Sequence, residues 1–403
     1  MKRVQARVSL GKVWTALSSL LIAGLGIFLV LFVGLDSHIA GYSPAEVEAA
    51  RAVQSLPSII ENPVNAPHKV VTWAFAQLTI DPVLAGRLAS ATFATLALLL
   101  FYVATRMWHG KRVAFLATLL LGTSSWFLLT ARSSDPNVSA SLAVTLLALS
   151  GYWMSLHFRS MWSYVAVVAS LALMVYVPGM VWLVLLGLIL RGRGIFQAMA
   201  RNLPAWKLAT LVALLLVFVI APIAYAGARD MHVLLALLGA PDELPRIMDV
   251  PQNLGWGLLS LFGWQHTPSA FSVGKLPLMD VVSVALALLG LVYYAAKLSL
   301  ERTRLLIGVL LLGLMLLSIG SPAGYAYLLP VVYFLAAGGI AYLLMRWLEV
   351  FPRNPLARGI GITLLALVIG FAVFYNLRAY FVAAPHADNI RQIYSGSTND
   401  LLN

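Results

Sequence analysis

The chain has 403 residues, of which 61% are hydrophobic and only 10% charged. A water-soluble domain of this size has roughly a quarter charged residues, so the composition excludes a soluble enzyme and predicts a membrane protein. The absence of cysteine excludes disulfide and thiol chemistry. The net charge of +12 comes without a basic stripe interleaved with aromatic residues, so nucleic acid is not an expected partner.

Apolar windows of about 20 residues predict an all-α polytopic protein with about 11 transmembrane helices in a single membrane domain, 1–403. In chain order they lie near 13–35, 83–107, 113–131, 136–157, 161–176, 177–190, 206–227, 278–296, 304–319, 325–345 and 359–377. The fifth and sixth are short and meet at Val177-Pro178-Gly179, which predicts a hairpin there because proline followed by glycine breaks a helix.

The distribution of charge predicts the orientation. With the N-terminus in the cytoplasm, most lysines and arginines fall on the inner side, as the positive-inside rule requires. Of the acidic residues, only Glu301 and Glu349 fall on that side. We therefore expect a multi-pass protein of the plasma membrane whose chemistry takes place on the outer face.

Three outer segments follow from this topology. The first, 36–82, is expected to hold a juxtamembrane helix from Pro44 to about Leu56, an irregular piece at 61–67, and a second helix from His68 to about Ile80. The second outer loop covers 228–277 and includes an amphipathic, tryptophan-containing stretch at 253–264, typical of the membrane interface. Residues 378–403 form an outer C-terminal tail.

Glu46 has two interpretations. Ser43-Pro44-Ala45-Glu46 is a capping box with proline in the first helical turn, in which the carboxylate only bonds back to the Ser43 N–H. The alternative is a catalytic carboxylate at the membrane surface. Glu48 lies about 200° further round the helix, so the two glutamates cannot face one substrate.

Asp135 and Arg132 lie between the third and fourth predicted spans. Asp135-Pro136 is a good helix start, with aspartate as N-cap and proline next. Arg132 either pairs with Asp135 or binds a phosphate at that helix N-terminus. Ionised groups so close to the apolar boundary are functional candidates by default.

His68 and Lys69 open the second outer helix, where a basic residue opposes the helix macrodipole. Lys69 is therefore either a solvated interfacial lysine or a ligand for a carboxylate or phosphate. An acidic patch, Asp242-Glu243 with Asp249, is either a solvated loop face or a site for a hard cation.

The order of these features resembles the GT-C superfamily of polyprenyl-phosphate-dependent glycosyltransferases. The shared order is one span, an outer loop with an acidic helix start, a proline-containing turn, a second outer helix, Arg87-Leu88-Ala89-Ser90 opening the next span, and then Arg132 and Asp135. Within this superfamily the chain most resembles glycosyltransferase family 39 and its relatives, which include protein O-mannosyltransferases and lipid A aminoarabinose transferases. The resemblance covers 14–160 well, and the stretch at 325–343 is similar to a late span of that family.

The resemblance implies a membrane glycosyltransferase that moves a sugar from a polyprenyl-phosphate donor to a lipid, glycan or protein acceptor among membrane lipids. The family opens its first outer helix with Asp-Glu; here Ala45 stands in the aspartate position and Glu46 in the glutamate position. By this resemblance Glu46 and Asp135 are the catalytic candidates. The candidate ligands of the donor phosphate are Lys69, His68, Arg132 and Arg87. No cofactor is firmly implied and a divalent metal is left open.

The alanine at position 45 keeps a second interpretation open. A protein that has lost the family's aspartate would bind or transport a lipid-linked glycan on the same scaffold without transferring the sugar.

Overall fold

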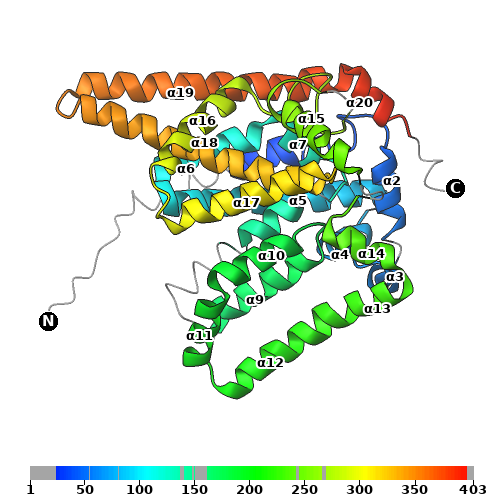
Figure 1. Cartoon of the computed structure of the whole chain (residues 1–403). Coiled ribbons are helices and arrows are strands. Elements are labelled where there is room, and N and C mark those ends of the chain that lie inside the picture. The colour runs from blue at the N-terminus through cyan, green and yellow to red at the C-terminus, as the bar shows by residue number, and fades with distance from the viewer. Residues whose placement is uncertain are drawn as a thin grey trace, which may run out of the picture.

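The computed structural model of the chain describes residues 24–396, except 54, 80, 137–139, 148, 150–160, 242–244 and 266–268. This part of the chain is built from helices, shown in Figure 1. In order they are α2 (Pro44–Arg51), α3 (Leu56–Glu61), α4 (Ala66–Ala76), α5 (Pro82–His109), α6 (Lys111–Thr123), α7 (Ser125–Ala131), α9 (Met161–Val175), α10 (Val181–Gly187), η1 (Leu188–Gly192), α11 (Arg193–Asn202), α12 (Ala205–Leu215), η2 (Leu216–Ile220), α13 (Ala221–Arg229), α14 (Met231–Leu238), η3 (Ile247–Asp249), α15 (Val250–Phe262), α16 (Val281–Ala295), α17 (Glu301–Ser318), α18 (Ala323–Val350), α19 (Pro355–Arg378), η4 (Ala379–Ala383), η5 (Ala384–His386) and α20 (Asp388–Ile393).

The predicted all-α polytopic fold is confirmed. Within the described ranges, five helices are long and apolar enough to cross a membrane, and a sixth is added if α6 and α7, bent by 66° at Ser124, count as one span. The five are 82–109, 181–202, 205–229, 323–350 and 355–386. The count of 11 stays a prediction. The predicted spans 13–35 and 136–157 lie partly outside the described residues, and the predicted spans 161–176 and 278–296 correspond to apolar helices of only 15 residues, Met161–Val175 and Val281–Ala295.

Helix α18 packs against α16, α17, α5 and α6, and α19 packs against α6 (Figure 1). The tightest pair is α16 with α18, which meet at glycines. A Cβ atom on Gly290 would lie 1.7 Å from the Leu335 carbonyl oxygen, and one on Gly339 would lie 2.0 Å from that of Leu286. Small residues allow such close backbone approach, which stabilises helix pairs in membranes where the hydrophobic effect between helices is weak.

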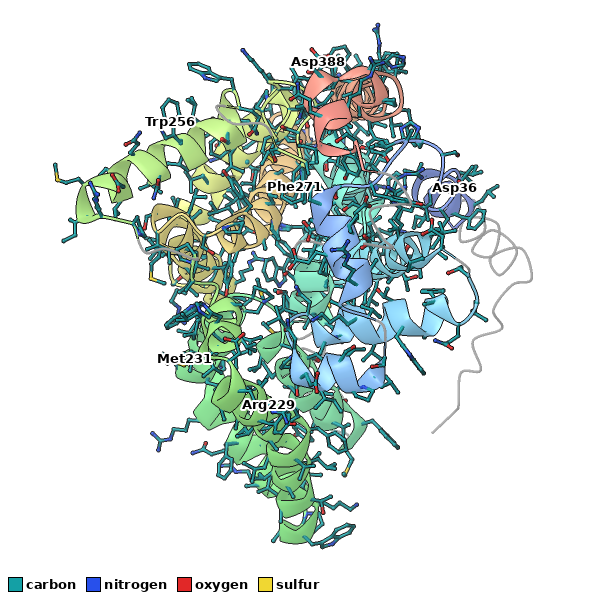
Figure 2. All side chains as sticks on the ribbon, turned by 90° about the vertical axis from the view of Figure 1, so that its right-hand side faces the viewer. Asp36, Arg229, Met231, Trp256, Phe271 and Asp388 are labelled. Carbon is teal, nitrogen blue, oxygen red and sulfur yellow. The ribbon has the colours of Figure 1, made fainter. Side chains whose placement is uncertain are left out.

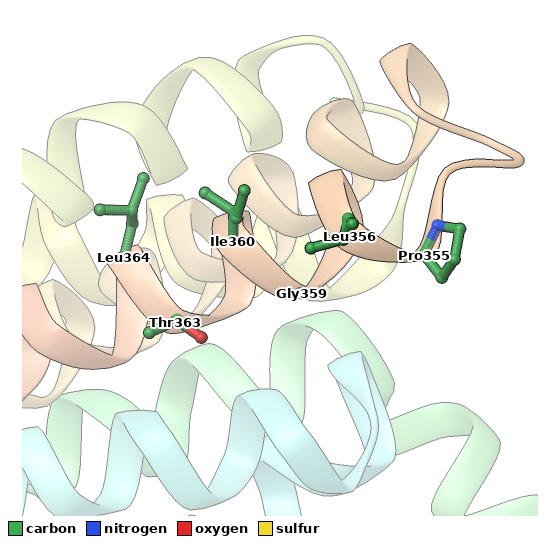
Figure 3. A pocket seen from close by; sticks show the side chains of 6 residues that line it. All are labelled: Pro355, Leu356, Gly359, Ile360, Thr363 and Leu364. Atoms are coloured by element: carbon green, nitrogen blue, oxygen red, sulfur yellow. The ribbon is translucent and has the colours of Figure 1, made fainter.

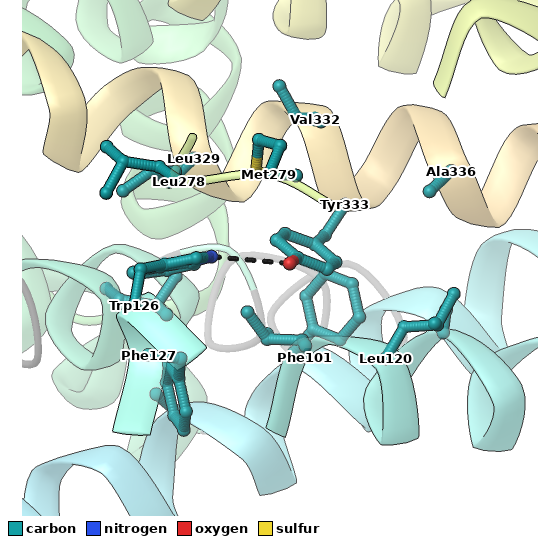
Figure 4. Close-up of a cluster of buried hydrophobic side chains, with 14 of the residues drawn as sticks. Phe101, Leu120, Trp126, Phe127, Leu278, Met279, Leu329, Val332, Tyr333 and Ala336 are labelled. Carbon is teal, nitrogen blue, oxygen red and sulfur yellow. Dashed lines mark hydrogen bonds between the residues drawn. The ribbon is translucent and has the colours of Figure 1, made fainter. Parts of the chain in front are cut away.

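A buried aromatic cluster fixes the short helix α7 against α18. The indole N–H of Trp126 donates a hydrogen bond to the Tyr333 hydroxyl at 3.3 Å, as Figure 4 shows. Both side chains are completely buried, together with Phe101 and Phe127. Because buried tryptophan and tyrosine need partners for their polar atoms, this bond lets the cluster pack without an unsatisfied group.

The hairpin at Val177-Pro178-Gly179 is confirmed between α9 and α10, with Gly179 in the left-handed region (φ +76°). In the first outer loop the predicted helix boundaries are less accurate. The first helix ends at Arg51 rather than near Leu56, because Ser55 caps a separate helix, α3, that has proline in its first turn. The second begins at Ala66 and ends at Ala76.

Figure 2 looks onto the end of the bundle that carries these short helices, which we call the loop end. Asp36, Phe271 and Asp388 lie on it, and Arg229 and Met231 lie lower on the same view. The loop end therefore gathers segments from the first outer loop, the second outer loop and the C-terminal part of the chain. The helix of α19 continues through η4 and η5 to His386, within the range predicted as an outer C-terminal tail, of which residues 397–403 lie outside the described residues.

Candidate functional site

The capping box at the start of α2 is present. The Ser43 hydroxyl oxygen accepts a hydrogen bond from the Glu46 N–H at 3.2 Å, and Glu46 Oε2 accepts one from the Ser43 N–H at 3.1 Å. The Glu46 side chain points inward and is 0% exposed. Local sequence therefore explains one of its bonds, but not its burial.

Burial of Glu46 is explained by Arg87, which reaches it from the first turns of α5. The guanidinium forms a two-pronged pair, Nε to Oε1 and Nη2 to Oε2, both at 2.9 Å. Oε1 also accepts the backbone N–H of Ser134 at 3.0 Å. With the capping bond, the carboxylate accepts four hydrogen bonds from three segments of the chain, the arrangement that a buried charge requires.

The remaining donors of Arg87 hold the chain that leads into α2. Nη1 donates to the Leu35 carbonyl and Nη2 to the Gly41 carbonyl, both at 2.9 Å. Four of its five N–H groups are thus engaged within the protein. Arg87 has little capacity left for a donor phosphate in this arrangement.

Arg132 is engaged in the same way at the end of the helix formed by 24–31. It donates to the carbonyls of Val30, Val33 and Gly34 at 2.8, 2.8 and 2.9 Å. A cation at a helix C-terminus satisfies the unpaired carbonyls there and complements the macrodipole. Its guanidinium carbon also lies 5.6 Å from the centre of the Tyr380 ring.

Asp135 follows directly on Ser134, the residue that binds Glu46. Ser134 is pressed against α5, where a Cβ atom on Gly86 would lie 2.5 Å from the Ser134 Cβ, so glycine is needed for this approach. Asp135 itself is partly exposed, unlike Glu46. Its charge reaches the buried Tyr394, whose pKa is raised by burial and by the nearby carboxylates Glu46 and Asp135.

His68 is only 3% exposed, and both ring nitrogens have partners. Nε2 lies 2.9 Å from the Ser90 hydroxyl of α5, and Nδ1 lies 3.3 Å from the Thr72 hydroxyl one turn on. Burial, reinforced by the neighbouring Lys69, lowers the pKa of His68 to about 3. The ring is therefore neutral at physiological pH and ties α4 to α5.

Lys69 differs from the two arginines. Its side chain is 9% exposed, and its ammonium donates to the Asn62 carbonyl at 2.8 Å. No carboxylate in the described ranges forms a salt bridge with Lys69. The negative charge of the exposed Glu48 nevertheless acts to raise the pKa of Lys69. Burial lowers the pKa of Lys69 to about 8, so the amine is mostly charged at pH 7 and able to take an anionic ligand.

The C-terminal part of the chain closes over this site, which sequence reasoning did not anticipate. Tyr42 and Gly396 form an antiparallel bridge, exchanging two N–H to carbonyl bonds of 3.0 Å. Gly41 adopts φ +90°, and a Cβ atom there would lie 2.1 Å from the Tyr394 carbonyl oxygen. The partners are more than 350 residues apart, and the only sequence signal is the glycine on each side.

The sequence left a divalent metal open, and the described residues contain no cluster of side chains that could bind one. No group of three or more histidine or carboxylate side chains gathers in the described ranges. Asp242 and Glu243 lie outside those ranges. Asp249 accepts the Arg246 N–H at 3.2 Å in a capping box.

A second surface feature is easily separated from this site. Figure 3 shows a shallow depression of about 500 Å³ along α19, lined by Pro355, Leu356, Gly359, Ile360, Thr363 and Leu364. A single hydroxyl is its only polar side-chain group. It is therefore a lipid-facing surface without the groups that would orient a substrate.

Comparison with known proteins identifies the fold. No family model and no curated protein sequence matches the chain. Among solved structures it is similar to ArnT from Cupriavidus metallidurans in the apo state, with a TM-score of 0.58 and 16% identity, over 94% of this chain and 77% of that one. The same protein bound to undecaprenyl phosphate gives a TM-score of 0.53 at 15% identity, over 96% and 78%.

The apo oligosaccharyltransferase of Archaeoglobus fulgidus gives a TM-score of 0.55 at 15% identity. The match covers 92% of this chain but only 56% of that one, so the chain spans about half the length of that transferase. At sequence identities of 15 to 16%, these structural similarities establish the fold and nothing more. The GT-C fold predicted from the sequence is therefore confirmed for this chain.

Proposed function

We propose that the chain is a membrane glycosyltransferase that takes its sugar from a polyprenyl-phosphate donor at the loop end of the bundle. The observation that carries the proposal is the likeness in fold, along nearly the whole chain, to a protein solved with undecaprenyl phosphate bound. The buried, poorly paired ammonium of Lys69 at the loop end is the group most suited to a phosphate.

Asp135 is the carboxylate that we assign as the catalytic base. It would accept the proton of the acceptor hydroxyl as that oxygen attacks the anomeric carbon and the bond to the polyprenyl phosphate breaks. Its partial exposure favours this role over Glu46, which is fully buried and accepts four hydrogen bonds. Glu46 then acts as a positioning residue that holds the Ser134 backbone, and with it Asp135.

Lys69 is assigned to the departing phosphate, whose negative charge grows as the glycosidic bond breaks. Arg87 and Arg132 shape the loop through their carbonyl contacts. His68 is proposed to support Lys69 without contacting substrate, because its hydrogen bonds to Ser90 and Thr72 fix α4 on α5. Of the six candidate residues, Asp135 and Lys69 are thus proposed to contact substrate. The other four, Glu46, Arg87, Arg132 and His68, are proposed to hold the surrounding segments in place.

The test follows release of polyprenyl phosphate by the full chain in lipid nanodiscs, supplied with a panel of undecaprenyl-phosphate sugars and membrane lipid or glycan acceptors. Asp135→Asn is expected to lower the rate at least 100-fold, within the range for loss of a general base. Binding of undecaprenyl phosphate should be unchanged. Asp230→Asn, which removes an exposed N-cap carboxylate on α14, is the matched control and should retain wild-type transfer.

If Asp135→Asn releases polyprenyl phosphate at nearly the wild-type rate, Asp135 is not the catalytic base. If Glu46→Gln turns over at an unchanged rate, Glu46 has no positioning role. If no donor in the panel is turned over while undecaprenyl phosphate binds, the second candidate function applies.

That second function is binding of a lipid-linked glycan without transfer. It is favoured by Ala45, an exposed position where the related family carries an aspartate, next to a Glu46 already neutralised by Arg87. Ala45→Asp separates the two: a scaffold that has lost only its base would gain turnover from a near-zero level, whereas an active transferase using Asp135 would gain nothing.

A further inference from the structure

A cavity of about 440 Å³ lies between two groups of helices, away from the Glu46 and Lys69 site. One wall comes from α9, α10, η1 and residues 145–146 and 149, and the other from α17 and α18, with Trp108 at the end of α5. Most of the wall residues are aliphatic, among them Leu171, Leu183 and Val309, and the charged residues of the lining are Arg191, Glu301 and Arg302. The rim is open, since Leu188 and Leu190 are 48% and 45% exposed.

The volume falls within the roughly 300 to 1,000 Å³ range of small-ligand sites. Water is a poor occupant, because it needs two to four polar partners and these walls offer few. Helices α10 and η1 belong to a membrane-spanning stretch, 181–202, so hydrocarbon chains are the natural filling of a cavity open at this surface. Any acyl chain fits such a cavity about as well as it fits the bilayer, so selectivity must come from a headgroup.

A cationic and aromatic cluster supplies the means to select a headgroup. It lies at the end of the bundle where α5 ends and α17 begins, opposite the loop end. The Arg302 side chain lines the cavity, donates to the Trp108 carbonyl at 2.8 Å and contacts the Tyr293 hydroxyl at 3.5 Å. The ammonium of Lys297 lies 4.0 Å from the centre of the Tyr293 ring. Tyr293 therefore contacts both cations, of which Arg302 lines the cavity and Lys297 lies on the other side of the Tyr293 contact.

The acidic groups nearby do not neutralise this pair. Glu301, which lines the same cavity, forms its salt bridge with Arg191. Across the described ranges, no carboxylate forms a salt bridge with Arg302 or Lys297. Basic residues that serve only membrane orientation are expected to extend into water, as the exposed Arg304 does. Arg302 instead lines an apolar cavity.

We propose that this cavity binds an anionic phospholipid, with one acyl chain between the two helix groups and the phosphate held by Arg302 and Lys297. The site is distinct from the proposed donor site, lies at the opposite end of the bundle, and does not depend on glycosyl transfer. A bound lipid here would fill the space between α10 and α17 and so join the two groups of helices.

The test is native mass spectrometry of the full chain released from bilayers that contain equal amounts of phosphatidylglycerol and phosphatidylcholine. Wild-type protein is expected to retain phosphatidylglycerol preferentially. Lys297→Gln should lower the preference about fivefold, the effect of one cation near an anionic lipid surface. Arg304→Gln, which removes an exposed arginine two residues after Arg302, should leave it unchanged.

A second pair of variants tests the acyl-chain cavity. Gly187 lines the cavity and has nothing within 4 Å of a Cβ placed on it, so Gly187→Phe can fill the space without a clash at the backbone. It should remove the retained lipid. Gly194→Phe is the matched control, because Gly194 has equally open surroundings but does not line the cavity.

Equal retention of the two lipids by the wild type would overturn the proposal. So would an equal loss of preference in Lys297→Gln and Arg304→Gln, which would indicate only a general surface charge. Displacement of phosphatidylglycerol by millimolar inorganic phosphate would point to a site for free phosphate, and full lipid retention by Gly187→Phe would exclude the cavity.

Discussion

Arg87 and Lys69 are two cations at the same end of the bundle with opposite surroundings. Both are almost completely buried, at 3% and 9% exposed, on the helices α5 and α4, which pack together. Arg87 meets a carboxylate and two backbone carbonyls, which take up four of its donors. Lys69 meets one carbonyl, and its pKa is lowered to about 8.

The difference separates a structural charge from one that is available to a ligand. A buried ion stays charged at low cost only when partners replace its lost hydration. Arg87 has those partners within the protein. Among the described residues Lys69 has one carbonyl partner and no salt bridge, and an anionic ligand would supply further partners. Sites of ligand binding are where such incompletely satisfied charges are expected.

The largest expected effect on stability comes from removing Arg87. Arg87→Met leaves the Glu46 carboxylate buried without its cation, and we expect a loss of about 3 to 5 kcal/mol in the free energy of unfolding. Thermal unfolding of the purified protein in detergent, followed by the fluorescence of its tryptophans, measures the effect.

The double variant Glu46→Leu with Arg87→Met is the control, because replacing both charges removes the penalty of an unpaired ion. It should recover much of the lost stability. If each single variant and the double variant are equally unstable, the cost comes from the lost carbonyl contacts of Arg87 and the pair itself contributes little.

The sequence was sufficient for those features that depend on local pattern. Apolar runs predict a polytopic helical fold, the Ser43 and Glu46 spacing predicts the capping box, and Val177-Pro178-Gly179 predicts the hairpin. The structure contains the capping box and the hairpin, and its described residues contain five or six of the predicted spans. The order of motifs also indicated the GT-C fold. These signals lie within one helix or turn, or in the order of helices along the chain.

What the sequence could not supply is the set of long-range partners. Glu46 and Arg87 are 41 residues apart, and Glu46 and Ser134 are 88 apart. Nothing in the local pattern around Arg87 or Arg132 distinguishes an arginine that binds backbone carbonyls from one that binds a phosphate. The contact of Gly41 with Tyr394 joins two segments that are far apart in the sequence, and no sequence motif in either segment indicates that they pack together.

Removing Lys69 tests whether this second cation serves ligand binding rather than stability. Lys69→Met should weaken binding of undecaprenyl phosphate at least tenfold, because a charge-assisted hydrogen bond to the phosphate contributes about 1.5 to 3 kcal/mol. The stability of the ligand-free protein should be unchanged or raised, since a poorly paired buried charge is replaced by an apolar side chain of similar length.

Isothermal titration with undecaprenyl phosphate in nanodiscs measures the affinity, and thermal unfolding the stability. Lys275→Met is the matched control, an exposed lysine whose removal should change neither. A variant at position 69 that loses stability but keeps its affinity would assign Lys69 to the fold, with its Asn62 contact as the reason.

The smallest expected effect is the pH dependence of the same binding. Lys69 is protonated below pH 8 and neutral well above it, so affinity for undecaprenyl phosphate should fall as the pH rises past about 8, by up to about tenfold per unit. The phosphate itself, with a second pKa of about 6, keeps a constant charge over that range. Lys69→Met should show no such fall.

The stability of the ligand-free protein responds to the same proton in the opposite direction. Because the pKa of Lys69 is lower in the folded chain than in the unfolded chain, the cost of burying its charge is fully present below pH 8 and is relieved as the pH rises toward 10.5. Weaker binding together with undiminished stability between pH 8 and 9.5 would therefore identify deprotonation of Lys69. Parallel loss of both would instead indicate alkaline unfolding, and with it no special role for this lysine.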